Sequence, residues 1–326
     1  MSTKFEIAVP DLSAERLGNT DTPGVWSFDS GSAGPSVLIT ALIHGNEICG
    51  AWALKELLAA GVRPKKGRLV LAFCNLAAFD TLDVGAHDAA RFVDEDMNRV
   101  WTGDKLGQPV TQERRRALEL KKWVAAADWL LDIHSMHEPS PPLMMTGMLK
   151  RNVDLANRLG VPQRVIMDAG HKDGTRMRDF DQFGDPQASA LALLIECGYH
   201  GDPSSVDTAR NVVAHFLLAS DIVDADDLPD HWVRTRKGPQ TVLQVTAPVV
   251  ARSESLSFSA AYQGMECIAR AGTQIGQDGD KPIITPYDNC VLIMPSLRQL
   301  KVGVTVLRFA RELQTVSPRE ATASHG

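Results

Sequence analysis

The sequence predicts an α/β fold with a mixed, mostly parallel central sheet and helices on both faces, followed by a small C-terminal β domain. Between about residues 36 and 223, short apolar runs rich in β-branched residues alternate with longer helical segments, which is typical of parallel strands joined by crossover helices. After an acidic stretch, DADDLPD, the pattern changes to short apolar runs separated by Gly and Pro, which indicates β structure. We therefore predict two domains, 1–223 and 224–326.

The expected strands of the first domain are near-continuous hydrophobic runs, as strands covered on both faces should be. They span 36–43, 68–75, 128–135, 164–170 and 190–198. Helices are expected over 48–61, which ends at Gly61 and is followed by Pro64, and over 204–223, which begins at a serine cap. The last residues, SPREATASHG, are expected to form a loose tail.

Composition and charge exclude several classes of partner. The formal net charge is -6 and the basic residues are scattered, so a nucleic-acid surface is not expected. The one dense basic cluster, Arg114 to Arg116, lies in a segment of helical spacing with Leu118, Val124 and Ala125 expected inward, which favours a solvated helix face. No apolar run reaches the roughly 20 residues of a membrane helix.

The N-terminus and the cysteines favour a cytoplasmic protein. The first residues, MSTKFEIAVPDLSAE, lack the features of a secretory signal. The 5 cysteines are widely spaced, without a CxxC pair, so we expect reduced core thiols rather than a disulfide framework.

A candidate metal site begins where the first long strand runs into His44-Gly45-Asn46-Glu47. Residues three apart in a helical turn point the same way, so His44 and Glu47 can reach one ion. Open α/β sheets bind ligands at the carboxyl ends of their strands, which is where this motif lies. An HxxE pair alone is weak support, because such pairs occur by chance in many helices.

A second histidine strengthens the metal hypothesis. His134 ends the strand DWLLDIHS, and Asp132 lies two residues before it, on the same strand face. His44, Glu47 and His134 would form a two-histidine, one-glutamate set, which is typical of catalytic zinc with an open position. Asp132 would orient the His134 imidazole. The alternative is that both histidines are ordinary residues near turns.

Glu196 has the properties of a general base. It interrupts the apolar strand ALALLI at its carboxyl end, where a charge costs several kcal/mol unless it is used or paired. A carboxylate that is not a metal ligand can take a proton from water and pass it to a leaving nitrogen. The alternative is a structural ion pair.

The loop ARFVDEDMNRVW carries Arg91, Asn98 and Arg99. Guanidinium groups bind carboxylates and stabilise oxyanions, so the loop suits a substrate with a carboxylate. Equally, the acidic neighbours Asp94 to Asp96 would neutralise the arginines in a surface network. His137 and His200 are alternative ligands or substrate contacts, and His87, His171, His215 and His231 are expected to be structural.

Taken in order, HGNE, RFVDEDMNR, DIHS and IECG resemble the motifs of the succinylglutamate desuccinylase and aspartoacylase family, a branch of the zinc carboxypeptidase-like fold. The resemblance is close over about 36–200 and loose over the β domain. It implies one Zn²⁺ per chain and the following site residues. The ligands are His44, Glu47 and His134, the catalytic residues are Glu196 and Arg99, and the substrate contacts are Arg91, Asn98 and Tyr287.

The resemblance further implies that 1–223 is a catalytic zinc hydrolase domain and that 224–326 contributes to the substrate pocket. The expected activity is hydrolysis of the amide bond of a small N-acylated amino acid. A carboxypeptidase acting on short peptides, or an inactive binding protein of the same fold, are the alternatives. Neither Arg176 nor Arg178 aligns clearly with the family's carboxylate-binding arginine, so the substrate stays open, and a homo-oligomer is compatible with the sequence.

Overall fold

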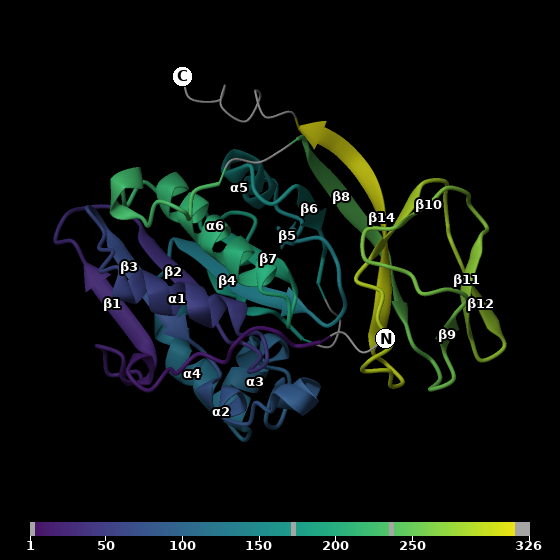
Figure 1. The fold of residues 1–326 in the computed structure, drawn as a ribbon, viewed down its shortest axis with the longest axis horizontal. Helices are drawn as coiled ribbons and strands as arrows, with labels where there is room; N and C mark the ends of the chain where they lie inside the picture. Colours follow the sequence, from purple (N-terminus) through teal and green to yellow (C-terminus); the bar gives the residue numbers. More distant parts are fainter. Residues whose placement is uncertain (1–3, 171–173, 235–237, 317–326) are drawn as a thin grey trace.

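The protein is built on one long twisted sheet, which confirms the predicted fold class (Figure 1). The computed structural model describes residues 4–170, 174–234 and 238–316. Over these residues the sheet is 11-stranded, in the order β1-β3-β2-β4-β7-β5-β6-β8-β14-β13-β10. A separate 3-stranded sheet has the order β12-β11-β9.

The first part of the sheet is mostly parallel. Strands β2, β3, β4 and β7 run parallel, while β1 and β5 pair antiparallel with β3 and β7. The bounds are β1 Val25–Asp29, β2 Ser36–Ala41, β3 Arg68–Phe73, β4 Trp129–Met136, β5 Leu143–Met145, β6 Arg164–Met167 and β7 Leu191–Tyr199. The five predicted strands are all present, whereas β1 and the three-residue β5 were not predicted.

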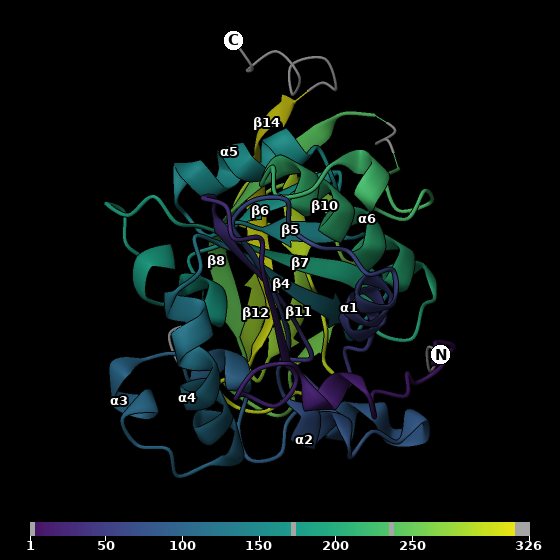
Figure 2. The same ribbon diagram turned by 90° about the vertical axis from the view of Figure 1, so that its left-hand side faces the viewer.

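Helices cover both faces of this sheet, as Figure 2 shows with α1 and α6 on one side and α3 and α4 on the other. The α-helices are α1 Cys49–Ala59, α2 Leu76–Phe79, α3 Gly103–Leu106, α4 Gln112–Ala125, α5 Lys150–Leu159 and α6 Ser204–Ala219. Short 3-10 turns are η1 Glu15–Leu17, η2 Val84–Ala90, η3 Met97–Arg99, η4 Met177–Asp179, η5 Asp181–Phe183 and η6 Ala225–Asp227.

Alternation along each strand divides the core into two layers, because successive side chains point to opposite faces. On β4, Leu131 and Ile133 pack in the layer that contains α1, α5 and α6. Leu130 of the same strand packs in the layer that contains α4. Both layers exclude water, so the sheet is a rigid platform for whatever its strand ends carry.

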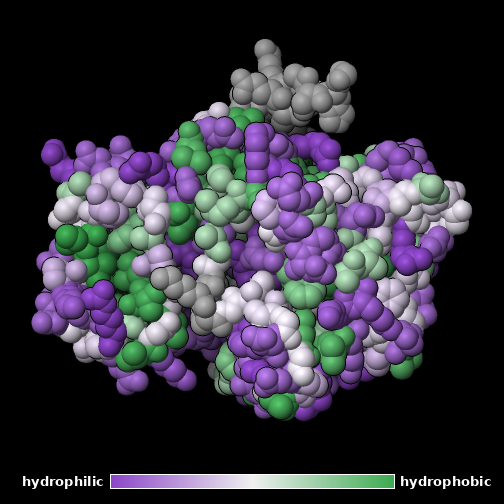
Figure 3. All heavy atoms as spheres, turned by 180° about the vertical axis from the view of Figure 1, so that it is seen from behind, coloured by the Kyte–Doolittle hydropathy of each residue, from purple (hydrophilic) through white to green (hydrophobic). Residues whose placement is uncertain are grey.

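The C-terminal strands continue the sheet rather than standing apart from it. Strand β8 pairs in parallel with β6, and β14, β13 and β10 follow antiparallel. Figure 3 shows this part of the chain as a lobe at the left, with hydrophobic residues gathered on it. The bounds are β8 Gln240–Val250, β9 Ser257–Phe258, β10 Cys267–Ile268, β11 Gln274–Asp278, β12 Lys281–Ile284, β13 Cys290–Ile293 and β14 Thr305–Val316.

Three local expectations were wrong. Helix α6 has no side-chain cap, and Asp202 accepts a hydrogen bond from the Ser204 N–H instead. On α4, Val124 is buried as expected, but Leu118 and Ala125 are exposed, and Ala117 and Leu120 are buried in their place. Cys267 is an exposed thiol, although the other cysteines are buried and free.

Two further points concern the expected tail and the expected absence of membrane spans. The tail from Ser317 onward lies outside the described residues. Among the helices that the structure describes, none has both the length and the apolar character needed to cross a membrane.

Candidate metal centre and active site

The first two candidate ligands lie in the turn between β2 and α1. The Glu47 N–H donates to the His44 carbonyl at 3.1 Å, which closes a helical turn just before α1 begins. Gly45 is required there, since a Cβ atom would lie 2.4 Å from the Ala78 backbone. The turn therefore points the side chains of His44 and Glu47 the same way, as the spacing predicts.

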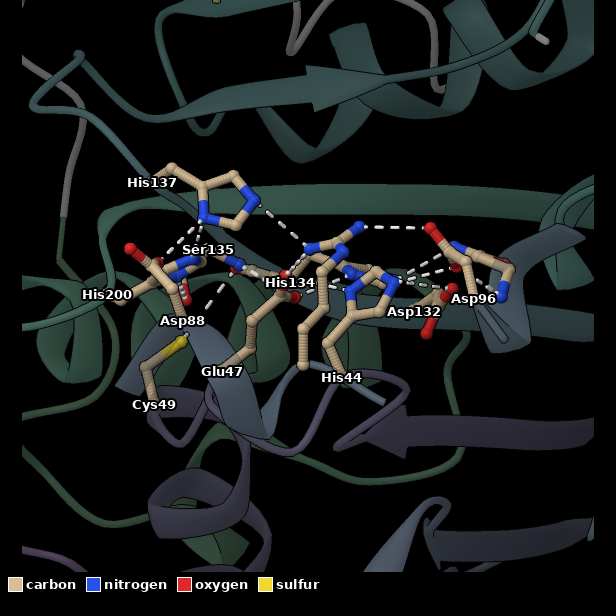
Figure 4. Close-up of polar contacts among 12 residues, drawn as sticks. His44, Glu47, Cys49, Asp88, Asp96, Asp132, His134, Ser135, His137 and His200 are labelled. Carbon is tan, nitrogen blue, oxygen red and sulfur yellow. Dashed lines mark hydrogen bonds and ion pairs between the residues drawn. The ribbon is translucent and has the colours of Figure 1, made fainter. Parts of the chain in front are cut away.

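His134, from β4, completes a compact cluster with these two residues (Figure 4). His44 Nδ1 lies 2.8 Å from Glu47 Oε1, and His134 Nδ1 lies 2.7 Å from Glu47 Oε2. One ligand atom from each residue lies within 4.8 Å of the others, and all three residues are buried. Among the described residues, these three side chains form the group of His, Cys, Asp or Glu residues whose ligand atoms lie close enough together to hold one metal ion.

The outward nitrogen of each histidine faces an aspartate. His134 Nε2 lies 2.8 Å from Asp132 Oδ2, as predicted, and His44 Nε2 lies 2.9 Å from Asp96 Oδ1. A carboxylate behind the imidazole fixes the ring and raises its basicity, which is the usual arrangement of histidines that bind zinc. Sequence reasoning missed this role of Asp96, because the acidic run around it was interpreted only as a partner for the arginines.

The chemistry of this donor set fits zinc. Zn²⁺ accepts both imidazole nitrogens and carboxylate oxygens as ligands. Two imidazoles and one carboxylate occupy three of its four usual positions and leave the fourth open. Burial disfavours the charged form of Glu47, but the two histidines outweigh it and hold the pKa of this carboxyl well below its usual range. Glu47 therefore presents a carboxylate, which is the form that a metal ion binds.

Glu196 lies directly across from His134 in the register of β4 and β7. Its Oε2 atom is buried and has no hydrogen-bond partner among the described residues. Burial, and then the charge of Glu47, raise the pKa of Glu196 to about 8. The described contacts of Oε2 thus give no support to the alternative of a structural ion pair, and this oxygen is available to exchange a proton.

The loop between Arg91 and Arg99 surrounds the cluster. Arg91 donates through Nη1 to Glu47 Oε1 at 3.1 Å and through Nη2 to Asp96 Oδ2 at 3.2 Å. Arg99 Nη1 donates to the Asn98 carbonyl at 2.8 Å. Burial opposes the charge of Arg91, but Asp96 and Glu47 raise its pKa. Both interpretations of this loop agree with the structure in part. Its arginines line the cavity, as substrate binding requires, and they also pair with acidic residues.

Asn98 holds the loop in place. Its Oδ1 accepts a hydrogen bond from the Met177 N–H at 2.9 Å, and its Nδ2 lies 3.3 Å from His134 Nε2. The Asn98 carbonyl oxygen is therefore engaged by the backbone, while its buried amide group lies beside His134 and the residue also lines the cavity.

Glu113, at the start of α4, shapes the same loop and was not predicted. Its buried carboxylate accepts hydrogen bonds from the N–H groups of Val93, Asp94 and Glu95 at 2.7, 3.1 and 3.3 Å. The neighbouring Arg114 donates to Glu95 at 2.6 Å. Within the basic cluster of α4, Arg114 thus fastens the loop instead of only facing solvent. In the sequence, Glu113 is only a glutamate in the first turn of an expected helix, and nothing in that position indicates that it holds the loop.

The cluster opens into a cavity of about 650 Å³ lined by residues from both halves of the chain. An apolar strip is formed by Met136, Met145, Leu194 and Met294. Cationic side chains are contributed by Arg91, Arg99, Arg176, Arg298, Lys301 and Arg308. The last three come from the C-terminal part and were not predicted, because nothing in their spacing connects them with the metal motifs.

The two arginines left open by the sequence have different positions. Arg176 lines the cavity and donates to Asp179 at 2.5 Å. Arg178 is fully buried, and its Nη2 donates to the carbonyls of Thr146 and Ala192. Of this pair, only Arg176 is placed to meet a ligand.

Tyr287 requires a correction, because the structure does not bring it to the cavity. Its hydroxyl lies 2.7 Å from Thr246 Oγ1, and the Arg311 guanidinium covers its ring at 4.4 Å. It packs in the C-terminal core and is not among the lining residues. His171 lies outside the described residues.

Fold and site together define an α/β protein with a buried His-Glu-His cluster at the carboxyl ends of its strands, the arrangement of catalytic zinc enzymes. Residues 33–218 match the succinylglutamate desuccinylase/aspartoacylase catalytic domain. The chain belongs to this family, as its ordered motifs predict.

Several relatives of known sequence or structure resemble almost the whole chain. A succinylglutamate desuccinylase of Burkholderia cenocepacia is 26% identical, with 89% of this chain and 87% of the relative covered. The structure of succinylglutamate desuccinylase from Vibrio parahaemolyticus has a TM-score of 0.65 at 16% identity and covers 90% of both chains. A product-bound ectoine utilization protein from Ruegeria pomeroyi has a TM-score of 0.62 at 17% identity and covers 86% of both chains.

Proposed function

We propose that the protein is a zinc-dependent amidohydrolase that removes the acyl group from a small N-acylated amino acid. The observation that carries the proposal is the buried Glu196 carboxyl without a hydrogen-bond partner on Oε2, opposite a His-Glu-His cluster. Membership of the family and the names of its relatives support deacylation in particular.

His44, Glu47 and His134 would hold the zinc ion, with Asp96 and Asp132 fixing the two imidazoles. Bound zinc supplies Lewis acidity, which makes a water molecule more acidic and polarises an acyl carbonyl. The remaining chemistry belongs to the side chains of the cavity.

Glu196 takes the proton from the attacking water and returns it to the nitrogen of the leaving amine. The pKa of about 8 suits both steps, because a group that titrates near neutral pH accepts and releases protons readily. A dication nearby would favour the ionised carboxylate and lower this pKa toward neutrality. Arg99 would stabilise the negative charge that develops on the carbonyl oxygen.

The cavity suits a small anionic substrate. Its volume of about 650 Å³ falls within the range of roughly 300–1,000 Å³ that is usual for small-ligand sites. Arg91, Arg99 and Arg176 are placed to attract a carboxylate, and the apolar strip offers room for an aliphatic chain. We further propose that 1–223 is the catalytic domain and that 224–326 contributes the far wall of the pocket, in a cytoplasmic enzyme whose cysteines are free thiols.

The proposal is tested with a panel of N-acetyl and N-succinyl amino acids and dipeptides, assayed by release of the free amine. We expect an N-acyl amino acid to be the best substrate, and Glu196→Gln to lose about 100- to 10,000-fold in turnover while it keeps its zinc.

Three outcomes would contradict this assignment. Preference for dipeptides would indicate a carboxypeptidase. Binding without turnover would indicate an inactive binding protein. Unchanged turnover in Glu196→Gln would remove Glu196 from the mechanism.

A further inference from the structure

Two histidines that the proposed mechanism does not use lie beside the metal cluster. His137 follows β4 and lies beside Asp88, and His200 follows β7 and lies beside Ser135 (Figure 4). His200 is fully buried, and burial lowers the pKa values of both histidines. Both rings are therefore neutral at pH 7, and each carries a single N–H group.

These residues form one chain of contacts. Ser135 Oγ lies 2.8 Å from His200 Nδ1, and His200 Nε2 lies 3.2 Å from His137 Nδ1. His137 Nδ1 also lies 3.3 Å from Asp88 Oδ1, while His137 Nε2 lies 3.4 Å from Arg91 Nη1.

Arg91 sets the direction of every hydrogen bond in the chain, because a guanidinium group only donates. His137 Nε2 must accept from Arg91, so its single proton is on Nδ1 and points to Asp88 Oδ1 and His200 Nε2. His200 Nε2 then accepts, and its own proton is on Nδ1 and points to Ser135 Oγ. The geometry thus assigns the Nδ1–H tautomer to both rings.

The two ends of the chain meet on the same metal ligand. Arg91 Nη1 donates to Glu47 Oε1 at 3.1 Å, and the Ser135 N–H donates to Glu47 Oε2 at 3.3 Å. Arg91 therefore holds one oxygen of the Glu47 carboxylate and Ser135 holds the other. His137 and His200 connect Arg91 with Ser135.

We propose that His137 and His200 are positioning residues that fix the orientation of the Glu47 carboxylate through Arg91 and Ser135. The residues touch neither the metal ligand nor a reacting atom themselves. Their effect on catalysis rests on the proposed zinc-dependent function, whereas their tautomers do not.

The tautomers are tested by long-range ¹H–¹⁵N correlation spectra of the full-length, zinc-loaded protein labelled at histidine nitrogen. Signals are assigned by their loss in His137→Gln and His200→Gln. We expect a protonated Nδ1 and an unprotonated Nε2 in both rings. A protonated Nε2 on His137 would overturn the proposal, because that nitrogen would no longer accept from Arg91.

Matched variants test the positioning role through zinc affinity, measured by competition with a chromophoric chelator. His137→Leu removes the acceptor for Arg91, and we expect it to weaken zinc binding about 10- to 100-fold, the usual effect of losing an outer partner of a ligand. His137→Gln keeps an acceptor oxygen near the position of Nε2, so most of the affinity should return.

His215→Leu is the control, since this histidine lies on α6 and its Nε2 lies 3.2 Å from the Arg234 carbonyl oxygen, away from the metal cluster. Equal losses in His137→Leu and His137→Gln, or no loss in either, would contradict a positioning role. Absence of acyl-amino-acid turnover in the wild type would contradict the proposed function instead, and the spectra and zinc affinities would still decide the positioning role.

Discussion

At the scale of single residues, two aspartates decide how well the cluster can bind a metal. Asp132 was predicted, since it shares a strand face with His134 and period-two alternation is a firm rule. Asp96 was not, because its partner His44 lies far away along the chain and only the fold brings the two together. Asp132 could thus be paired with His134 from the strand alternation, and His134 with His44 and Glu47 from the motifs, whereas no pattern or motif connected Asp96 with His44.

The role of Asp96 leads to a prediction. Asp96→Asn keeps the shape but removes the charge that orients His44, so we expect zinc affinity to fall about 10- to 100-fold. Asp132→Asn should behave in the same way, because its position behind His134 is equivalent. Chelator competition measures both, with Asp104→Asn on the short helix α3 as a control. Wild-type affinity in both site variants would mean that the aspartates do not support the ligands.

At the scale of elements, the strands and long helices of 36–223 could be predicted because their hydrophobic patterns are strong. The antiparallel β5 has only three residues, too few for a pattern. Tyr287 was assigned by resemblance over the part of the chain where the motifs are weakest, and its ring packs in the C-terminal core instead. Long helices and strands with a clear hydrophobic pattern could be predicted from the sequence. The contacts made by the loops between them could not.

Several contacts with the start of α4 hold the loop that carries Arg91, Asp96 and Arg99, and the Glu113 carboxylate makes three of them. Glu113→Gln would give the part-buried N–H groups of Val93, Asp94 and Glu95 a neutral side chain in place of a charged acceptor, and hydrogen bonds to charged groups contribute about 1.5–3 kcal/mol. We expect lower stability in urea unfolding and weaker zinc binding together, because the loop supports His44 through Asp96.

The matched control for this prediction is Glu119→Gln on the same helix. Its side chain is 54% exposed and pairs with Arg116, so stability should change by less than about 0.5 kcal/mol. If Glu113→Gln lowered stability without any change in zinc binding, the loop would not transmit the effect to the metal centre.

At the scale of the whole molecule, the site exists only when distant segments meet. The proposed metal ligands come from the turn after β2 and from β4, and the proposed base, Glu196, comes from β7. The cavity is closed by the C-terminal part, where Arg298 donates to Glu138 at 2.8 Å and to Asp88 at 3.4 Å. Through Asp88 these contacts reach His137, so the C-terminal wall is joined to the network around Glu47.

The sequence predicted a β-rich C-terminal part but not its continuity with the central sheet. Parallel pairing of β8 with β6 joins segments separated by α6 and β7, and local patterns carry no information about which strand lies next to which. The cationic wall formed by Arg298, Lys301 and Arg308 follows from that pairing. We therefore expect substrate recognition to depend on the part of the fold that was least predictable.

We propose above that His44, Glu47 and His134 form a catalytic zinc centre in a deacylase. The most direct test of this claim is to strip the protein with a chelator and titrate zinc back while measuring hydrolysis of the best N-acyl amino acid in the panel. We predict that turnover rises in proportion to added zinc and levels off at one equivalent per chain. Full turnover by protein that retains less than about one-tenth of an equivalent would contradict the claim.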